Sequence, residues 1–259
     1  MARLNDTTTF NADAYSAEVV GLATELRNHD SGAHSHRRAQ LLYARQGCVR
    51  ITLADQLCLL PPGRAAWIPP DTVHRAVMTN VVDYRSIYFR ADIATAMPHD
   101  VRVLSISPLL FEVLEAIATV EFDQCWQTGR RRHLLGLSVA EICSAPCEPT
   151  LLPLPSDRRL SRLLHKPEQL PPELKILEGE IGASGKTVTR IFLKQTGMTY
   201  QQWRQQWRVM RAIELLTTGH SISTTAAELG FSSDSVFISF FRKIMGKTPR
   251  SYLQTRPVS

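Results

Sequence analysis

The chain has 259 residues, of which 44% are hydrophobic and 21% charged, and its net charge is +6. This length accommodates two modest domains, and the composition is ordinary for a globular protein. No apolar run approaches the roughly 18 residues that span a bilayer, and residues 1–10 lack the apolar core of a secretory signal. We therefore expect a cytoplasmic protein with no membrane association.

The positive charge is concentrated in the C-terminal part of the chain. From Asp157 onward, 16 Lys and Arg residues stand against 8 Asp and Glu residues, whereas the preceding part holds 14 against 16. A basic module joined to a near-neutral one fits a polyanionic partner for the C-terminal part alone. An incidental excess of surface arginine would give the same balance, so charge leaves both interpretations open.

The segment 36–90 has the composition of short strands separated by turns. Gly47 and two proline-containing turns lie between the strand-like runs, which are 41–44, 48–53 and 86–89. Several short strands at such spacing predict an all-β sandwich or barrel.

Helical periodicity replaces the strand pattern from Pro108. Apolar residues recur at helical spacing over 109–117 and again over 134–142, which predicts two amphipathic helices within 108–145. These helices either pack against the β-domain or form a dimer interface. Four prolines between positions 145 and 155 then predict a semi-rigid linker over 146–156.

One sequence pattern occurs twice in the C-terminal part, 49 residues apart. Ser184, Phe192, Lys194, Gly197 and Thr199 correspond to Ser233, Phe241, Lys243, Gly246 and Thr248. Each copy begins with a serine that can cap a helix and ends with a glycine that can close it. A shorter helix precedes each copy through a tight turn. The pattern therefore predicts two helix-turn-helix units, at about 172–195 and 222–245.

Residues 230–249 resemble the signature of AraC/XylS-type transcriptional regulators. The segment is GFSSDSVFISFFRKIMGKTP. The first helix-turn-helix of that family is resembled by the upstream residues Arg190, Phe192 and Gly197 together with the helix that contains Trp203. The resemblance covers about two-fifths of the chain, 157–253. It implies a regulator that binds a double-stranded DNA operator in a sequence-specific manner, and it leaves activation and repression equally open.

The resemblance also implies which residues contact DNA. Carried over position by position, the set is Lys186, Thr189, Arg190, Lys194, Asp234, Ser235, Ser239, Arg242 and Lys243. Arg190 is suited to a bidentate contact with guanine, whereas Asp234 would repel phosphate unless it accepts from a cytosine amino group. We expect the first unit to supply most of the base recognition and the second mainly to position the protein, with Arg242 and Lys243 near phosphate.

Two N-terminal stretches, 34–42 and 67–74, resemble a cupin barrel, which is the usual sensory domain of these regulators. The resemblance implies a pocket for a small organic effector. The residues that we expect to line it are His34, His36, Tyr43, Trp67, His74 and Tyr88.

Three of these histidines match the metal ligands of metal-binding cupins, in which a glutamate is the fourth ligand. Here Gln40 stands near the place of that glutamate. Three imidazoles can hold zinc, nickel or iron, but the missing carboxylate favours a ligand pocket or structural histidines. We therefore predict no metal and no cofactor. A cupin enzyme with oxygenase or isomerase chemistry at these histidines is an alternative, as is an architectural DNA-binding protein without an effector.

The sequence as a whole predicts a non-enzymatic, two-domain α+β regulator. We expect a cupin-like sensing barrel over 1–107, a helical dimerisation segment over 108–145, the linker over 146–156 and an AraC-type DNA-binding domain over 157–255. A homodimer is expected. The motifs are most similar to a subgroup related to nitroimidazole-response repressors, whose members often control an adjacent efflux transporter gene.

Overall fold

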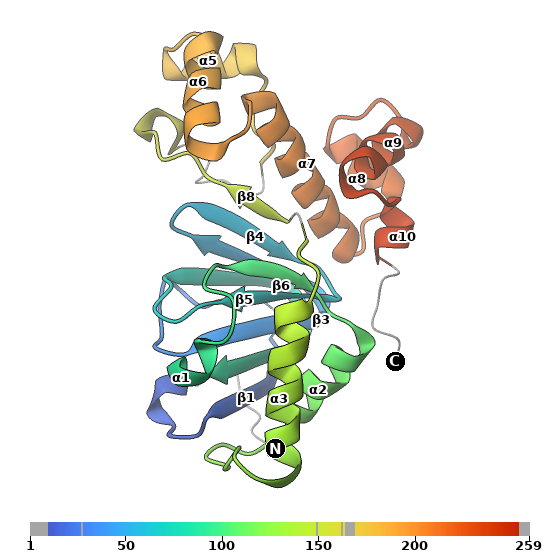
Figure 1. The fold of residues 1–259 in the computed structure, drawn as a ribbon. Helices are drawn as coiled ribbons and strands as arrows, with labels where there is room; N and C mark the ends of the chain where they lie inside the picture. Colours follow the sequence, from blue (N-terminus) through green and yellow to red (C-terminus); the bar gives the residue numbers. More distant parts are fainter. Residues whose placement is uncertain (1–9, 27, 149, 162, 164–168, 254–259) are drawn as a thin grey trace. The chain divides into compact units, whose positions relative to one another are not determined.

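The computed structural model describes residues 10–26, 28–148, 150–161, 163 and 169–253. Contacts divide the chain into two compact units that change over between Thr150 and Leu151, with Ala54–Leu57 counted in the second. The first unit is rich in strands and the second in helices, which confirms the predicted α+β class (Figure 1). The finer domain limits given above stay predictions.

The first unit is built around a twisted sheet. Strands β1, β6, β3 and β4 are neighbours in that order, β2 also pairs with β6, and β5 pairs with β3 and β7. Their bounds are β1 Val19–Thr24, β2 His29–Asp30, β3 Ala39–Leu53, β4 Gln56–Leu60, β5 Arg64–Ile68, β6 His74–Phe89 and β7 Arg102–Ser105. Over the described residues this sheet does not close on itself, so the predicted barrel is corrected to an open sheet.

Strand β3 is one continuous strand, where the sequence predicted two strands separated at Gly47. The register between β3 and β6 shifts between Gln46 and Cys48, which identifies a β-bulge. Gly47 has φ +85, and a Cβ there would lie 2.4 Å from the carbonyl oxygen of Asn80. The glycine therefore allows a close crossing of two paired strands and does not mark a turn.

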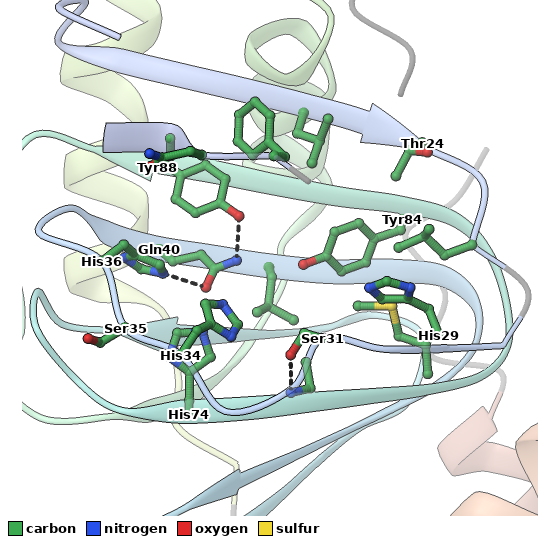
Figure 2. Close-up of a pocket in the computed structure, with 18 of the residues that line it drawn as sticks. Thr24, His29, Ser31, His34, Ser35, His36, Gln40, His74, Tyr84 and Tyr88 are labelled. Carbon is green, nitrogen blue, oxygen red and sulfur yellow. Dashed lines mark hydrogen bonds between the residues drawn. The ribbon is translucent and has the colours of Figure 1, made fainter. Parts of the chain in front are cut away.

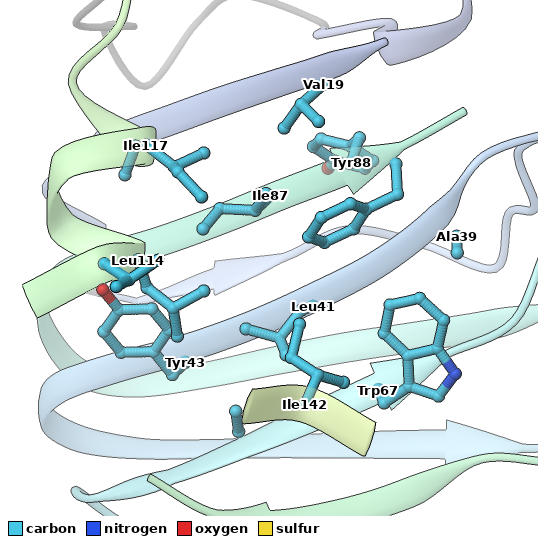
Figure 3. Packing of buried hydrophobic residues seen from close by; sticks show 14 of the residues in the cluster. Val19, Ala39, Leu41, Tyr43, Trp67, Ile87, Tyr88, Leu114, Ile117 and Ile142 are labelled. Atoms are coloured by element: carbon cyan, nitrogen blue, oxygen red, sulfur yellow. The ribbon is translucent and has the colours of Figure 1, made fainter. Parts of the chain in front are cut away.

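The core of the first unit lies between the sheet and helices α2, Pro108–Ala118, and α3, Gly129–Ser144. Side chains alternate along each strand, so Leu41 of β3 and Ile87 of β6 point to the same buried layer (Figure 3). Leu114 and Ile142 cover that layer from the two helices. The short helices η1, Ala12–Ala14, and α1, Ala91–Ala94, complete the unit.

The second unit is helical apart from the short strand β8, Leu151–Pro153, and the first two residues of β4. Its helices are η2 Arg158–Leu160, α5 Leu174–Ile181, α6 Gly185–Thr196, α7 Tyr200–Thr217, α8 Ile222–Glu228, α9 Asp234–Met245 and α10 Pro249–Leu253. The sequence also predicts a helix over 159–165, and residues 162, 164 and 165 of that segment lie outside the described residues. No helix in the described part of the chain is long and apolar enough to cross a membrane.

The helix caps of the second unit are those that the repeat predicted. The side chains of Ser184 and Ser233 accept hydrogen bonds from the first turns of α6 and α9. Gly197 and Gly246 close the same helices in the left-handed conformation. Because these caps depend on residues a few positions apart, the sequence determines both helix ends locally.

Aromatic side chains hold the second unit together. Phe192 and Phe241 are fully buried, so both phenyl rings point inward. The Trp203 ring lies 5.1 Å from that of Phe192, and its Nε1 donates to the Pro153 carbonyl at 2.7 Å. At a rise of 1.5 Å per residue, the 18 residues of α7 span about 27 Å. This helix packs against α6 at one end and against α8 and α9 at the other.

The close packing of β1 on α2 gives a first prediction. A Cβ at Gly21 would lie 2.4 Å from the Ile117 carbonyl oxygen and 2.7 Å from Cα of Ala118. We expect Gly21→Ala to lower the free energy of unfolding by about 2–3 kcal/mol, because two backbone segments must separate. Chemical denaturation of the full chain measures this.

Gly136→Ala is the matched control, because a Cβ at this α3 position meets nothing within 4 Å. It should leave stability unchanged or raise it by up to about 1 kcal/mol through helix propensity. Equal stabilities of the two variants would contradict the described packing.

Candidate functional sites

The first unit contains a cavity of about 750 Å³. This volume lies in the usual range for small-molecule pockets. Its polar lining is Asn11, Asp13, Thr24, His29, Ser31, His34, Ser35, His36, Gln40, His74, Tyr84 and Tyr88, and its apolar lining is Phe10, Ala12, Leu22, Leu26, Leu42, Ala76 and Met78 (Figure 2). No Lys or Arg occurs among the described residues that line it.

Strand alternation decides which side chains reach the cavity. Gln40 and Leu42 of β3 line it, whereas Leu41 and Tyr43 belong to the core on the other side of the sheet. Gln40 is directly opposite Tyr88 across the β3–β6 register, so both side chains enter the cavity side by side.

Three histidines meet at the cavity because their backbones are paired. His34 and His74 exchange two backbone hydrogen bonds of 2.9 Å, and the carbonyl of His36 accepts from the Asp71 amide at 2.9 Å. One ring nitrogen from each of the three lies within 4.8 Å of the others, and this is a set that could hold a metal ion. The three imidazoles therefore converge at the cavity.

Each histidine ring is oriented by a backbone carbonyl. Nδ1 of His34 donates to Gly32 at 3.1 Å, Nδ1 of His36 to Arg38 at 2.5 Å and Nδ1 of His74 to Thr72 at 2.8 Å. Burial lowers the pKa of His74 to about 4, so this ring is neutral at neutral pH.

Gln40 connects the histidines to β6. Its Nε2 donates to the Ser86 hydroxyl at 2.8 Å. The same Nε2 donates to the Tyr88 hydroxyl at 3.1 Å, and Oε1 lies 3.1 Å from Nε2 of His36 (Figure 2). Burial raises the pKa of Tyr88 to about 12, so the phenol stays protonated. The glutamine is 2% exposed, so this network is fixed inside the protein.

Tyr43 and Trp67 do not line the cavity with the other expected effector residues. The Tyr43 hydroxyl donates to Glu115 of α2 at 2.8 Å, and Trp67 Nε1 donates to the Pro98 carbonyl at 2.8 Å. Both side chains belong to the core. Their places in the lining are taken by residues that the sequence analysis missed, notably Thr24, His29, Ser31 and Tyr84. Even spacing from Tyr88 along one strand would have pointed to Tyr84.

In the second unit, α5–α6 and α8–α9 form two helix-turn-helix pairs. The backbone amide of Gly185 donates to the Glu178 carboxylate, which ties α6 to α5. The Ser223 hydroxyl donates to Asp234 at 2.5 Å, which ties α9 to α8. The Arg208 guanidinium of α7 lies 4.0 Å from the centroid of the Phe231 ring, in the turn before α9. The second helix of each pair is thus held in place by side chains of its own unit.

The expected DNA-contacting side chains are accessible on these two helices. Thr189 and Asp234 are partly buried, and the exposed ones are Lys186, Arg190, Lys194, Ser235, Ser239, Arg242 and Lys243. No carboxylate in the described part of the chain forms an ion pair with the cations of this set. Their charges are therefore available to phosphate.

Asp234 and Val236 lie in the first turn of α9. The contact with Ser223 occupies one carboxylate oxygen of Asp234, which supports a role in positioning α9. Val236 is 48% exposed near the start of α9, and the sequence analysis did not include it. An exposed apolar side chain on a helix that enters the major groove suits contact with the methyl group of thymine. Val236 lies between Ser235 and the buried Phe237, and this position next to an inward-facing residue is the sequence signal that could have identified it.

Family models match both units. Residues 16–133 match the AraC-like ligand binding domain, and residues 177–255 match a helix-turn-helix domain. Most of the cavity lining lies in the segment matched as ligand binding, with Phe10–Asp13 before it. The paired helices from residue 177 onward lie in the segment matched as helix-turn-helix.

Two relatives and one solved structure are similar to this chain. The HTH-type transcriptional regulator NimR of Escherichia coli strain K12 is 29% identical over 226 residues, which cover 86% of this chain and 82% of NimR. The HTH-type transcriptional regulator RipA of Corynebacterium glutamicum is 36% identical over 103 residues, 39% of this chain and 31% of RipA. The fatty-acid-bound structure of ToxT from Vibrio cholerae is 14% identical, with a TM-score of 0.35 over 91% of this chain and 94% of ToxT.

The fold and the two sites define a transcriptional regulator with a ligand-binding domain and a helix-turn-helix DNA-binding domain. The chain belongs to the AraC family of such regulators.

The contacts of Glu115 with Tyr43 and Arg85 give a second prediction. Glu115 accepts from the Tyr43 hydroxyl and pairs with Arg85 at 3.1 Å, while Arg85 is 8% exposed. We expect Glu115→Ala to lower the free energy of unfolding by about 3 kcal/mol, because a buried guanidinium loses its main partner. The exposed Glu121→Ala should change it by less than about 0.5 kcal/mol. Similar stabilities of the two variants in urea would show that the network is not structural.

Proposed function

We propose that this regulator binds its operator mainly through α6 and that a small, uncharged organic molecule in the cavity modulates this binding. The observation that supports the proposal best is the presence, on one chain, of two exposed basic recognition helices and a cavity with converging polar groups. A homodimer in the cytoplasm, without enzymatic activity, is part of the proposal. The partly exposed Leu109 and Leu137 of α2 and α3 are candidates for the dimer surface.

The lining of the cavity supports the class of effector. Its described residues include no Lys or Arg to pair with an anionic ligand, and Asp13 is the carboxylate among them. Hydroxyl, amide and imidazole groups instead offer hydrogen bonds, and Phe10, Leu42 and Met78 offer apolar surface. A compact heterocycle with nitrogen or oxygen acceptors matches this combination.

The similarity to NimR directs the choice of target genes and test compounds. We propose that the regulated gene lies next to that of the regulator and encodes an efflux transporter, and that nitroimidazoles are the first compounds to test. This part of the proposal rests on family resemblance and not on the geometry of the cavity.

DNA recognition gives a third prediction. We expect Arg190→Ala to weaken binding to the natural operator by about 1–3 kcal/mol and to relax preference at one base pair, because a bidentate contact with guanine is lost. Lys194→Ala should weaken binding to all sequences alike and reduce the salt dependence by about one phosphate contact. Fluorescence anisotropy with operator and scrambled duplexes measures both effects.

Arg45→Ala is the control for this experiment, because Arg45 is exposed on β3 of the other unit, outside the cavity lining. It should leave operator affinity unchanged. Unchanged operator preference in Arg190→Ala would contradict the assignment of base recognition to α6.

The cavity gives a fourth prediction. Ala76 lines the cavity and is 3% exposed, whereas Val73 is 57% exposed and lies outside the lining. We expect Ala76→Phe to abolish the response of operator binding to an active compound without weakening binding in its absence, because the new ring occupies the ligand volume. Val73→Phe should respond as the unaltered protein does. A full response in Ala76→Phe would place the effector elsewhere.

A further inference from the structure

We propose that Glu178 of α5 is a positioning residue for operator recognition, because its carboxylate fixes the first turn of α6 against α5. This role rests on the proposed function, in which α6 supplies most of the base recognition. It adds to that function the group that holds the recognition helix in its orientation. Glu178 thereby determines how well the protein distinguishes its operator from other DNA, without contacting a base itself.

The turn between α5 and α6 is organised around Glu178. Its backbone carbonyl accepts from the amides of Gly182 and Ala183, the latter at 3.2 Å, and so closes α5. Its side-chain Oε1 accepts from the amide of Gly185, the first residue of α6. Amides at the start of a helix have no partner within the helix, and the helix dipole favours a carboxylate there. One residue therefore ends the first helix of the pair and binds the start of the second.

The two ends of α6 are held by different kinds of contact. At the C-terminal end, the buried Phe192 ring lies 5.0 Å from that of Tyr200 and 5.1 Å from that of Trp203, both on α7. At the N-terminal end, the hydrogen bond from Gly185 to Glu178 connects α6 to α5. The N-terminal residues of a recognition helix are those that contact base edges in a helix-turn-helix pair. Glu178 therefore acts at the end of α6 that matters most for recognition.

The expected base-contacting side chains begin directly after this hydrogen bond. Lys186 follows Gly185 in the chain, and Thr189 and Arg190 lie about one turn further along α6. A recognition site needs its side chains held within about 0.5 Å and 10–20° of the productive geometry. Contacts with phosphate carry no sequence information. A loosened first turn of α6 is therefore expected to lower discrimination between sequences more than general affinity for DNA.

The second helix-turn-helix pair has an equivalent connection made by different residues. The 49-residue offset of the repeat relates Gly185 to Asp234, and it relates Glu178 to Ala227. Each pair thus has one acidic residue at these two positions, on the first helix in one pair and at the start of the second helix in the other. The Asp234 carboxylate accepts from the Ser223 hydroxyl of α8 at 2.5 Å. Two unlike contacts produce the same connection, as expected if the start of a recognition helix must stay fixed.

Gly185 and Glu178 are also matched in size. A Cβ at Gly185 would overlap Oε1 of Glu178 and lie 3.3 Å from Cδ of the same side chain. Because Oε1 is the end of a flexible side chain, Gly185→Ala displaces the carboxylate and leaves the two helices folded. The φ of Gly185 is not positive, so the substitution adds no backbone strain. This contact offers a second way to break the connection, from the α6 side.

The test measures the affinity of the full chain for two duplexes by fluorescence anisotropy, one with the strongest mapped genomic site and one with its scrambled sequence. We expect Glu178→Ala to lower the ratio of the two affinities by about 5–10-fold, part of the roughly 5–150-fold that one bidentate base contact supplies. Glu178→Gln keeps an oxygen acceptor for Gly185 and should keep the ratio. Glu180→Ala is the matched control, because it removes an exposed carboxylate from the same helix, and it should also keep the ratio.

Gly185→Ala should lower the ratio as Glu178→Ala does. Combined with Glu178→Ala it should cause no further loss, because both substitutions act through one contact. Urea denaturation of each variant measures stability separately. A contact that only stabilised the fold would lower both affinities in proportion and leave their ratio unchanged.

Four results would overturn the role of Glu178. These are an unchanged ratio in Glu178→Ala, an equal loss in Glu178→Gln, an equal loss in Glu180→Ala, and additive losses in the double variant. Arg190→Ala in the same assay distinguishes this failure from failure of the proposed function. If Arg190→Ala lowers the ratio and Glu178→Ala does not, α6 recognises bases without help from Glu178. If neither lowers it, the assignment of base recognition to α6 is wrong, and the role of Glu178 with it.

Discussion

The alternation of side chains along the paired strands β3 and β6 is the constraint on which the first unit depends. Leu41, Tyr43 and Ile87 face the buried layer under the helices, and Gln40, Leu42 and Tyr88 face the cavity. One face of the sheet thereby packs against the core, and the other face lines the cavity. A shift of register by one residue would exchange the two faces and remove both. The bulge at Gly47, where a Cβ would lie 2.4 Å from the Asn80 carbonyl oxygen, helps to hold that register.

The second unit depends on local signals, and this is why its helices could be predicted from sequence. Ser184, Ser233 and the closing glycines act within a few residues of the helices that they limit. Phe192 and Phe241 follow from the helical period and the repeat. The tie between Ser223 and Asp234 could not be predicted, because it depends on the angle between α8 and α9 and not on either helix alone.

The first unit was predictable only in part, for a physical reason. The histidines of the cavity could be named from their motif, but Tyr43 and Trp67 were grouped with them on residue type. Side-chain direction in a strand is set by parity, and Tyr43 differs from Gln40 by an odd number of positions. The open sheet and the long strand β3 depend on pairing between distant segments, which turn-forming residues such as Gly47 do not reveal.

The central claim is that the two helix-turn-helix pairs, joined by the rigid helix α7, recognise successive major-groove segments of one operator. Genome-wide mapping of binding sites in the native host, followed by footprinting of the strongest site with purified protein, tests it most directly. We predict a discrete site beside the gene of the regulator or its neighbour, protected over two successive turns of about 10 base pairs each. Diffuse, salt-sensitive binding without a preferred site would contradict the claim.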